Sequence, residues 1–358
     1  MTAEYCELSR RHGSADYTES AEWRTRISEE GHLMKTLVLT RSEVEEVTTM
    51  ELAVTAVEGA FAGFGRGEAT MPPKVYLPIE DHDGDFRAMP ARLGDSAGIK
   101  WVNVHAHNRK RYGLPTVMAV YVLNDPANAF PLAVMDGTLL TALRTGAAGA
   151  IASKHLAQRA PRTISFIGCG TQAYTLHGSH QVVFDGFESL AHDRNDATAR
   201  RFAERVGARV VSLEDAAGAD IVCTATPSRT PFLQAHWVKP GAHINAMGAD
   251  APGKRELCTA TLKEAAVYID DIHQATGSGE INVPLADGDF SVDEIAGTLG
   301  EVVAGLQPRP DLGTTTVFDS TGLAIQDVSL ARAIYEAARS RSIGQEVDLI
   351  GVGSPAMG

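Results

Sequence analysis

The chain has few cysteines and no long apolar segment, and both absences restrict what it can be. Only four cysteines occur among 358 residues, and no two of them form a C-x-x-C pair. A disulfide framework and a cysteine zinc site are therefore disfavoured. No run approaches the roughly 18 consecutive apolar residues of a membrane span, and the N-terminal segment lacks the apolar core of a secretory signal. These absences predict a cytoplasmic protein with reduced thiols and no membrane partner.

Basic residues are also in the minority. The chain has 32 Lys and Arg against 45 Asp and Glu, a formal net charge of −13. A non-specific nucleic-acid binder would need a basic stripe to neutralise phosphates, so no nucleic-acid partner is expected. A small anionic substrate remains possible, because the field inside a cleft can oppose the net charge. The length suits about two domains.

The first part of the chain has the pattern of an antiparallel sheet with helices. A polar segment of mixed charge precedes Met34, so we interpret residues 1–33 as a flexible extension or as the result of a translation start placed too far upstream. A short strand is expected at 37–39, followed by a helix that Ser42 caps and that runs to Phe61. Strands are then expected at 74–77, 86–90, 98–104 and 117–123, followed by an Ala-rich helix at 137–157. Pro and Gly clusters between these strands favour hairpins over βαβ units.

The pattern changes at Arg162, where strands begin to alternate with helices. This alternation is typical of a doubly wound parallel sheet. The expected strands lie at 163–167, 188–192, 209–212, 220–226, 243–247 and 266–270. The C-terminal part after this series carries a further strand at 315–318 and a long helix at 325–340.

A glycine-rich turn follows the first strand of this second pattern. Gly168 permits the tight turn, Gly170 lets the backbone approach a pyrophosphate at the helix N-terminus, and Ala173 allows close packing. Asp193, at the end of the next strand, can accept hydrogen bonds from ribose hydroxyls, which favours NAD. The neighbouring Arg194 could instead hold the 2′-phosphate of NADP. Two triplets that end later strands on the same edge are predicted walls of the cofactor site: Thr224, Ala225 and Thr226, and Met247, Gly248 and Ala249.

Polar residues outside the glycine-rich turn are candidates for a substrate site: Lys74, Arg87, Lys100, Arg144, Asp250, Lys254 and Ser320. Lys100 stands within an apolar strand, where desolvation would lower its pKa toward the range of a proton donor or acceptor. The alternative is an edge residue whose side chain extends to water. Arg144 lies among small residues, and its planar guanidinium suits a carboxylate, although a salt bridge at a helix end remains an alternative. His105 and His107 have no partner Cys or His nearby and are interpreted as surface or packing residues rather than metal ligands.

Eight stretches resemble one known family in their order along the chain. They are MPPKVY from Met71, GIKWVN from Gly98, GLPTVM from Gly113, FPLAVMD from Phe130, LRTGAA from Leu143, FIGCGTQAY from Phe166, INAMGADAPGK from Ile244 and FDSTGLAIQD from Phe318. The chain resembles the ornithine cyclodeaminase/mu-crystallin family, and most closely its archaeal-type alanine dehydrogenase branch. The resemblance spans roughly residues 34 to 349 and excludes residues 1–33.

The resemblance implies a role for each matching residue. Lys74 and Arg144 would bind the carboxylate of an amino acid, Lys100 would transfer a proton, and Asp250 would face the amino group or the attacking water. Ser320 would lie near the nicotinamide. The expected cofactor contacts are Thr171, Gln172, Asp193, Lys254 and Ser320, with Arg144 also at the cofactor.

The resemblance also implies the architecture and the reaction. A Rossmann domain (161–315) would be inserted in an α+β domain for substrate binding and dimerisation (34–160 with 316–358), and the chain would form a homodimer. The expected reaction is the reversible, NAD-dependent oxidative deamination of L-alanine to pyruvate and ammonia. Alternatives are conversion of ornithine to proline with recycled NAD, reduction of a cyclic ketimine, and a binding role without turnover like that of mu-crystallin.

Overall fold

The computed structural model describes residues 34–157 and 160–351, so the extension predicted at residues 1–33 lies outside the described residues. Among the described residues, 37–345 belong to one compact unit, and 34–36 with 346–351 belong to a second. In the smaller unit, Lys35 Nζ lies 3.7 Å from the Glu346 carboxylate. Strand β16 (Gln345–Val347) begins at the last residue of the larger unit. Every site discussed below lies within residues 37–345.

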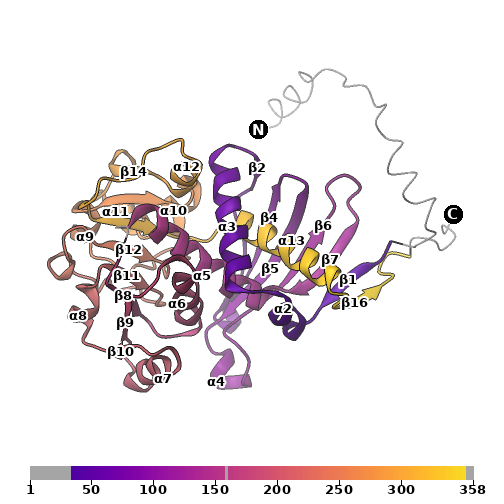
Figure 1. The fold of residues 1–358 in the computed structure, drawn as a ribbon, viewed down its shortest axis with the longest axis horizontal. Helices are drawn as coiled ribbons and strands as arrows, with labels where there is room; N and C mark the ends of the chain where they lie inside the picture. Colours follow the sequence, from indigo (N-terminus) through magenta and orange to yellow (C-terminus); the bar gives the residue numbers. More distant parts are fainter. Residues whose placement is uncertain (1–33, 158–159, 352–358) are drawn as a thin grey trace. The chain divides into compact units, whose positions relative to one another are not determined.

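The first sheet contains the hairpins that the sequence predicts. Its order is β1 (Thr36–Leu39), β7 (Pro131–Asp136), β6 (Val117–Asn124), β5 (Ser96–His105), β4 (Gly84–Leu93) and β2 (Ala69–Thr70), with β3 (Val75–Ile79) also paired to β4. All neighbours from β7 to β2 are antiparallel, whereas β1 is parallel to β7. Helix α13 (Ala324–Ser340) packs on β4 and β5, and α3 (Met50–Gly65) packs on α13 (Figure 1).

The prediction of a single helix from Ser42 to Phe61 is wrong, because the structure has two helices in this range. Thr40, not Ser42, caps α2 (Arg41–Val47), in a capping box with Glu43. Thr49 caps α3, and the extended Thr48 separates the two helices. Threonine hydroxyls compete with backbone groups for hydrogen bonds. The pair Thr48–Thr49 therefore favours the end of one helix and the start of the next over a continuous helix.

The second sheet is parallel throughout, which confirms the predicted doubly wound fold. Its order is β10 (Arg209–Val210), β9 (Glu188–His192), β8 (Thr163–Ile167), β11 (Ile221–Thr224), β12 (His243–Ala246), β15 (Thr316–Asp319), β13 (Ala266–Ile269) and β14 (Ile295–Thr298). Helix α5 (Gly137–Leu156) is buried along most of its length and packs on both α3 and α6 (Thr171–Val183). The remaining α-helices are α4 (Asn108–Tyr112), α7 (Asp196–Val206), α8 (Leu213–Ala217), α9 (Thr259–Lys263), α10 (Ile272–Ser278), α11 (Asn282–Asp287) and α12 (Leu299–Val303). Short 3-10 helices lie at Glu80–His82, Ala235–Trp237 and Val292–Glu294.

Strand β15 corrects the predicted domain boundary. The division at residue 315 assigned this strand to the first domain, but it lies between β12 and β13 in the parallel sheet. The chain therefore returns to the first sheet only after Asp319, through the turn that leads into α13. Among the described residues, no helix is both long and apolar enough to cross a membrane.

Candidate active site

Lys100 projects from β5 into the protein interior and forms a buried ion pair. Its side chain is 1% exposed, and its Nζ lies 2.7 Å and 2.8 Å from the two carboxylate oxygens of Asp327, which is fully buried on α13. The pKa of Lys100 is lowered to about 7, because burial and the Arg144 charge lower it by more than Asp327 raises it. The alternative of an edge residue reaching water is wrong, because β5 lies between β4 and β6. A lysine that titrates near neutrality is suited to proton transfer.

Arg144 lies in the middle of α5, not at a helix end. Its Nη1 donates to Gln326 Oε1 at 3.0 Å, and its Nε lies 3.2 Å from Asp327 Oδ1. The guanidinium rests on Gly322, where an added Cβ would lie 2.5 Å from Nη1 and where φ is +78°. Only glycine fits both requirements at this position.

Lys74 is the third cation of this region. It precedes β3, is half-buried, and donates from Nζ to the Thr321 carbonyl oxygen at 2.5 Å. Burial lowers the pKa of Lys74 to about 8, while the carboxylates of Asp270 and Asp250 oppose this shift. The cations of Lys74, Lys100 and Arg144 therefore lie within electrostatic reach of one another. Such a group is suited to the carboxylate of a substrate.

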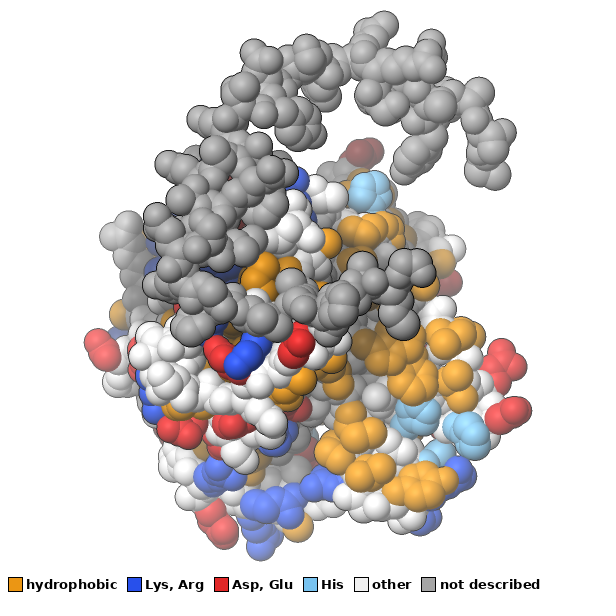
Figure 2. All heavy atoms as spheres, turned by 90° about the vertical axis from the view of Figure 1, so that its right-hand side faces the viewer, with side chains coloured by type: hydrophobic (Ala, Val, Ile, Leu, Met, Phe, Trp, Pro, Cys, Tyr) orange, Lys and Arg blue, Asp and Glu red, His pale blue; other side chains and the backbone are white. Residues whose placement is uncertain are grey.

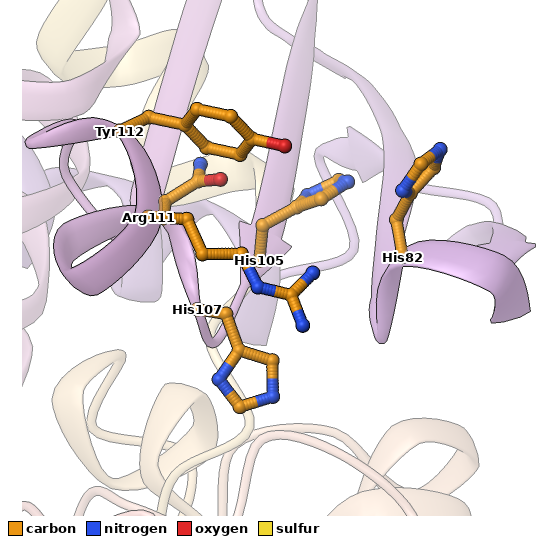
Figure 3. A pocket seen from close by; sticks show the side chains of 6 residues that line it. His82, His105, His107, Arg111 and Tyr112 are labelled. Carbon is orange, nitrogen blue, oxygen red and sulfur yellow. The ribbon is translucent and has the colours of Figure 1, made fainter.

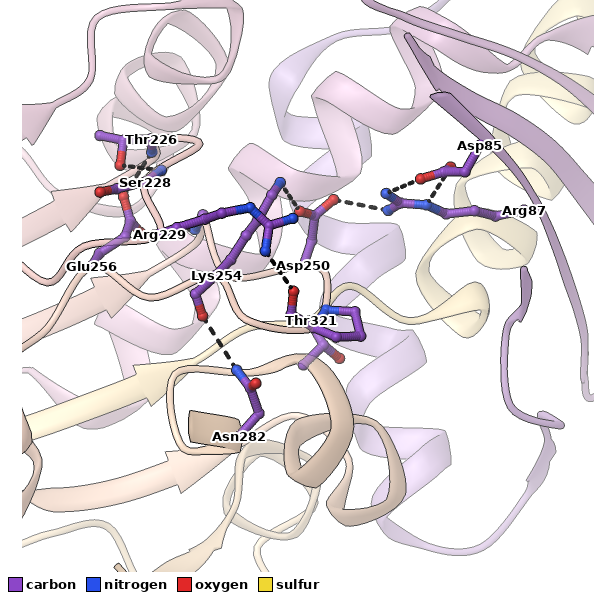
Figure 4. Close-up of polar contacts among 12 residues, drawn as sticks. Asp85, Arg87, Thr226, Ser228, Arg229, Asp250, Lys254, Glu256, Asn282 and Thr321 are labelled. Carbon is purple, nitrogen blue, oxygen red and sulfur yellow. Dashed lines mark hydrogen bonds and ion pairs between the residues drawn. The ribbon is translucent and has the colours of Figure 1, made fainter. Parts of the chain in front are cut away.

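Asp250 follows β12 and is held between two cations (Figure 4). Its Oδ1 accepts from Lys254 Nζ at 2.5 Å, and its Oδ2 accepts from Arg87 Nη1 at 3.0 Å. Burial raises the pKa of Asp250, but the charges of Lys254 and Arg87 hold it well below its usual range. Arg87 is itself fixed by Asp85, at 2.9 Å and 3.1 Å. Asp250 is thus an ionised hydrogen-bond acceptor rather than a proton donor.

The glycine-rich turn has the geometry that its sequence predicts. Gly168 has a φ of +91°, and an added Cβ would lie 2.7 Å from the Ala225 carbonyl oxygen. Gly170 precedes α6, whose first turn has no side-chain cap, so backbone N–H groups there are available to a phosphate. The Asp193 carboxylate accepts from Cys169 N at 2.9 Å and from Asn195 N at 2.8 Å.

A cavity of about 710 Å³ lies against this turn. Six of the predicted cofactor residues line it: Gly168, Gly170, Asp193, Arg194, Ala225 and Thr226. Other residues that line the cavity have no role predicted from the sequence, among them His192, Leu213, Arg229 and Phe232. The start of α6 without a side-chain cap, the cavity and the acid at the strand end together fit a dinucleotide.

The other predicted cofactor residues lie outside the lining of this cavity. Thr171 and Gln172 form the first turn of α6. The Thr224 hydroxyl donates to the buried Glu256 carboxylate at 2.6 Å, and Gly248 N donates to the same carboxylate at 2.9 Å. Met247, Gly248 and Ala249 directly follow β12. Lys254 pairs with Asp250. Ser320 is buried after β15, and its N–H donates to the Ala246 carbonyl oxygen at 3.0 Å.

A separate hollow of about 230 Å³ contains the histidines that the sequence singled out (Figure 3). His82, His105, His107, Arg111 and Tyr112 line it together with Asn108. The His105 ring packs edge-on against Phe86 at 5.6 Å, and His107, whose side chain is 49% exposed, lies 3.1 Å from Asp83. Within residues 34–157 and 160–351, no group of three or more His, Cys, Asp or Glu side chains could hold a metal ion.

A family model described as the ornithine cyclodeaminase/mu-crystallin family matches residues 34–342. The chain belongs to this family. The resemblance inferred from the motifs is thereby confirmed, and so is the α/β class of the fold.

Individual members of the ornithine cyclodeaminase/mu-crystallin family match nearly their whole length. The chain is 49% identical over 320 residues to the alanine dehydrogenase of Archaeoglobus fulgidus, covering 88% of this chain and 98% of that protein. The solved structure of an archaeal alanine dehydrogenase dimer with bound NAD superposes with a TM-score of 0.86 at 48% identity, covering 88% and 100% of the two chains. The ketimine reductase mu-crystallin of Rattus norvegicus is 34% identical over 310 residues, covering 84% and 96%.

Proposed function

We propose that this chain is an NAD-dependent alanine dehydrogenase. The reaction converts L-alanine, NAD⁺ and water to pyruvate, ammonium, NADH and a proton. The observation that carries the proposal is the buried Lys100, held by Asp327 beside the cations of Lys74 and Arg144. The 49% identity to the Archaeoglobus fulgidus alanine dehydrogenase supports alanine as the substrate.

The side chains divide the work of this reaction. Lys74 and Arg144 bind the substrate carboxylate and orient Cα. Lys100 accepts a proton from the substrate amine in the oxidative direction and returns it in the reductive direction. The ionised Asp250 accepts a hydrogen bond from the amine or from the water that replaces it. NAD⁺, when bound, supplies the two-electron acceptor for the hydride that leaves Cα.

The cofactor proposal is NAD in preference to NADP. Gly168, Gly170 and the first turn of α6, with Thr171 and Gln172, would hold the pyrophosphate, and Asp193 would bind the adenosine ribose. The Asp193 carboxylate would repel a 2′-phosphate, whereas the adjacent Arg194 would attract one. The bound NAD of the archaeal alanine dehydrogenase structure supports NAD.

We further propose that the chain forms a homodimer through the outer face of its first sheet. Apolar side chains gather there beside histidines (Figure 2). Trp101 is 42% exposed and Val120 47% exposed, and the two are paired across β5 and β6, with Phe86 stacked on Trp101 at 5.3 Å. Exposed apolar patches of this kind are typical of protein interfaces, and the matching archaeal structure is a dimer. The cytoplasmic location expected from the sequence stays a prediction.

The deciding experiment is NADH oxidation by the purified chain with pyruvate and ammonium. Alanine dehydrogenase activity requires both substrates together. Proline formed from ornithine, without turnover of pyruvate, would replace this proposal by a cyclodeaminase. Activity with a preformed cyclic imine and none with free ammonium would indicate a ketimine reductase. Binding of NADH with no turnover of any of these would indicate a binding protein.

A further inference from the structure

One backbone turn contacts two of the three cations at the substrate site. It runs from Ser320 to Gly322, between the end of β15 and the start of α13. The Thr321 carbonyl oxygen accepts from Lys74 Nζ, and Gly322 lies directly against the Arg144 guanidinium. A displacement of this turn would therefore move the partners of Lys74 and Arg144 together.

A buried carboxylate outside the site holds this turn in place. Asp270 directly follows β13, is fully buried, and accepts from Thr321 N at 2.6 Å and from Gly322 N at 2.8 Å. Its other oxygen accepts from the Thr321 hydroxyl and from Asp271 N, both at 2.9 Å. Burial raises the pKa of Asp270, whereas the Lys74 charge and the hydrogen bonds from Thr321 and Gly322 oppose this rise. Four donors pointing at one carboxyl group favour its ionised form.

We propose that Asp270 is a positioning residue for the substrate carboxylate. It acts through the Thr321–Gly322 turn on Lys74 and Arg144 and does not touch the substrate. This inference rests on the proposed function, in which those two cations bind a carboxylate.

Asp270 also acts on Lys74 through its charge. The charged groups that face Lys74 are the acids Asp270 and Asp250 and the cations Arg144, Arg87 and Lys100. Burial already lowers the pKa of Lys74 to about 8, and Asp270 is the strongest of the groups that oppose this shift. Loss of the Asp270 charge would leave three cations against one acid and would lower the pKa of Lys74 further. Because neutral lysine binds a carboxylate weakly, substrate binding would then fail at a lower pH than in the wild type.

The test compares Asp270→Asn with a matched control, Asp220→Asn. Asp220 is also a mostly buried carboxylate that accepts two backbone N–H groups, from Arg162 at 2.8 Å and Thr163 at 3.1 Å. It precedes β11 and so lies at the opposite edge of the sheet from Asp270. Each variant replaces a carboxylate that accepts hydrogen bonds from backbone N–H groups, but only Asp270 faces Lys74.

Two measurements are made on each protein from pH 6.5 to 9. In Asp270→Asn, the KM for pyruvate at saturating NADH should rise about tenfold at pH 8 and less at pH 6.5, with kcat changed less than about threefold. Competitive labelling of Lys74 with a trace amine-reactive reagent, quantified by mass spectrometry, should give a midpoint near pH 8 in the wild type. The midpoint should be lower in Asp270→Asn. Asp220→Asn should match the wild type in both measurements.

Equal KM profiles and equal Lys74 midpoints in the two variants would overturn the proposal. If Asp270→Asn does not fold, Thr321→Val removes only the hydroxyl donor to Asp270, and a wild-type KM and midpoint in that variant would overturn it as well. If the wild type does not turn over pyruvate, the proposed function fails. The labelling of Lys74 still tests the action of Asp270, because it requires no activity.

Discussion

The dinucleotide end and the substrate end of the proposed site are built in different ways. The glycine-rich turn and the acid of the dinucleotide end are close in sequence, between Gly168 and Arg194, and they face a cavity that residues 225–230 and 232 also line. The substrate end joins side chains far apart in sequence, such as Lys100 with Asp327 and Lys74 with Thr321, separated by 227 and 247 residues. Local chain geometry thus forms the dinucleotide end, and tertiary packing forms the substrate end. Substitutions at the dinucleotide end should change cofactor affinity alone, whereas substitutions at the substrate end should change catalysis or stability.

The largest expected effect is on catalysis, from Lys100→Ala. Without a proton acceptor at this position, kcat should fall by about 10²- to 10⁴-fold, the range of a general acid–base group. The Kd for NADH should stay within about twofold, since Lys100 lies outside the cavity at the glycine-rich turn. Stopped-flow or steady-state assays give kcat, and NADH fluorescence gives the Kd.

Lys110→Ala is the matched control for Lys100→Ala. Lys110 is an exposed lysine on α4, and its removal should leave kcat unchanged. A loss of NADH binding in Lys100→Ala equal to the loss of kcat would show that the two ends are not separate and would contradict the comparison.

The next effect is on stability, from Asp327→Asn. This change leaves Lys100 and Arg144 buried without their carboxylate, and breaking a buried ion pair costs about 3–5 kcal/mol. The control on the same helix is Glu336→Gln, which breaks the exposed pair of Glu336 with Arg332 and should cost less than about 0.5 kcal/mol. Urea denaturation measures both free energies of unfolding. Equal values would mean that the substrate end does not depend on tertiary ion pairing.

The same contrast explains which parts the sequence could predict. The motif around Gly168 and the acid Asp193 were predicted because their roles depend on neighbours in sequence, and the structure places both at the cavity. Lys100 could be singled out because a lysine within an apolar strand is unusual. Asp327 carried a similar signal, an acid within an apolar helical segment, but nothing in the sequence paired it with residues more than 180 positions away.

The misplaced domain boundary and the role of Asp270 have a related cause. Strand β15 has the same apolar character as strands of either sheet, so only its neighbours β12 and β13 assign it to the second one. Asp270 follows a strand in the manner of many ordinary surface acids. Its burial and three of its four donors depend on β15 lying beside β13, which the sequence pattern did not specify.

A smaller effect is expected at the dinucleotide end, from Asp193→Ala. Loss of charge-assisted hydrogen bonds to the ribose should raise the Kd for NAD⁺ about 10- to 100-fold and the Kd for NADP⁺ much less, because the repulsion of a 2′-phosphate is also removed. Asp196→Ala, at the exposed start of α7, should change neither Kd. Isothermal titration calorimetry with NAD⁺ and with NADP⁺ measures both Kd values. An equal loss for both cofactors would indicate that Asp193 only supports the turn through Cys169 N and Asn195 N.

The smallest expected effect, about tenfold in rate over two pH units, separates the two ends without any substitution. Because the pKa of Lys100 is lowered to about 7, its neutral form increases as the pH rises through 7. Alanine oxidation needs neutral Lys100 as a proton acceptor, so its kcat should rise about tenfold between pH 6 and 8, while kcat for pyruvate reduction should fall over the same range. The pH profiles of kcat for alanine oxidation and for pyruvate reduction should share one midpoint. The Kd for NADH, measured by fluorescence, should not change around that pH. A kcat that does not change between pH 6 and 8 in both directions would remove Lys100 from proton transfer and leave its ion pair with Asp327 as its only role.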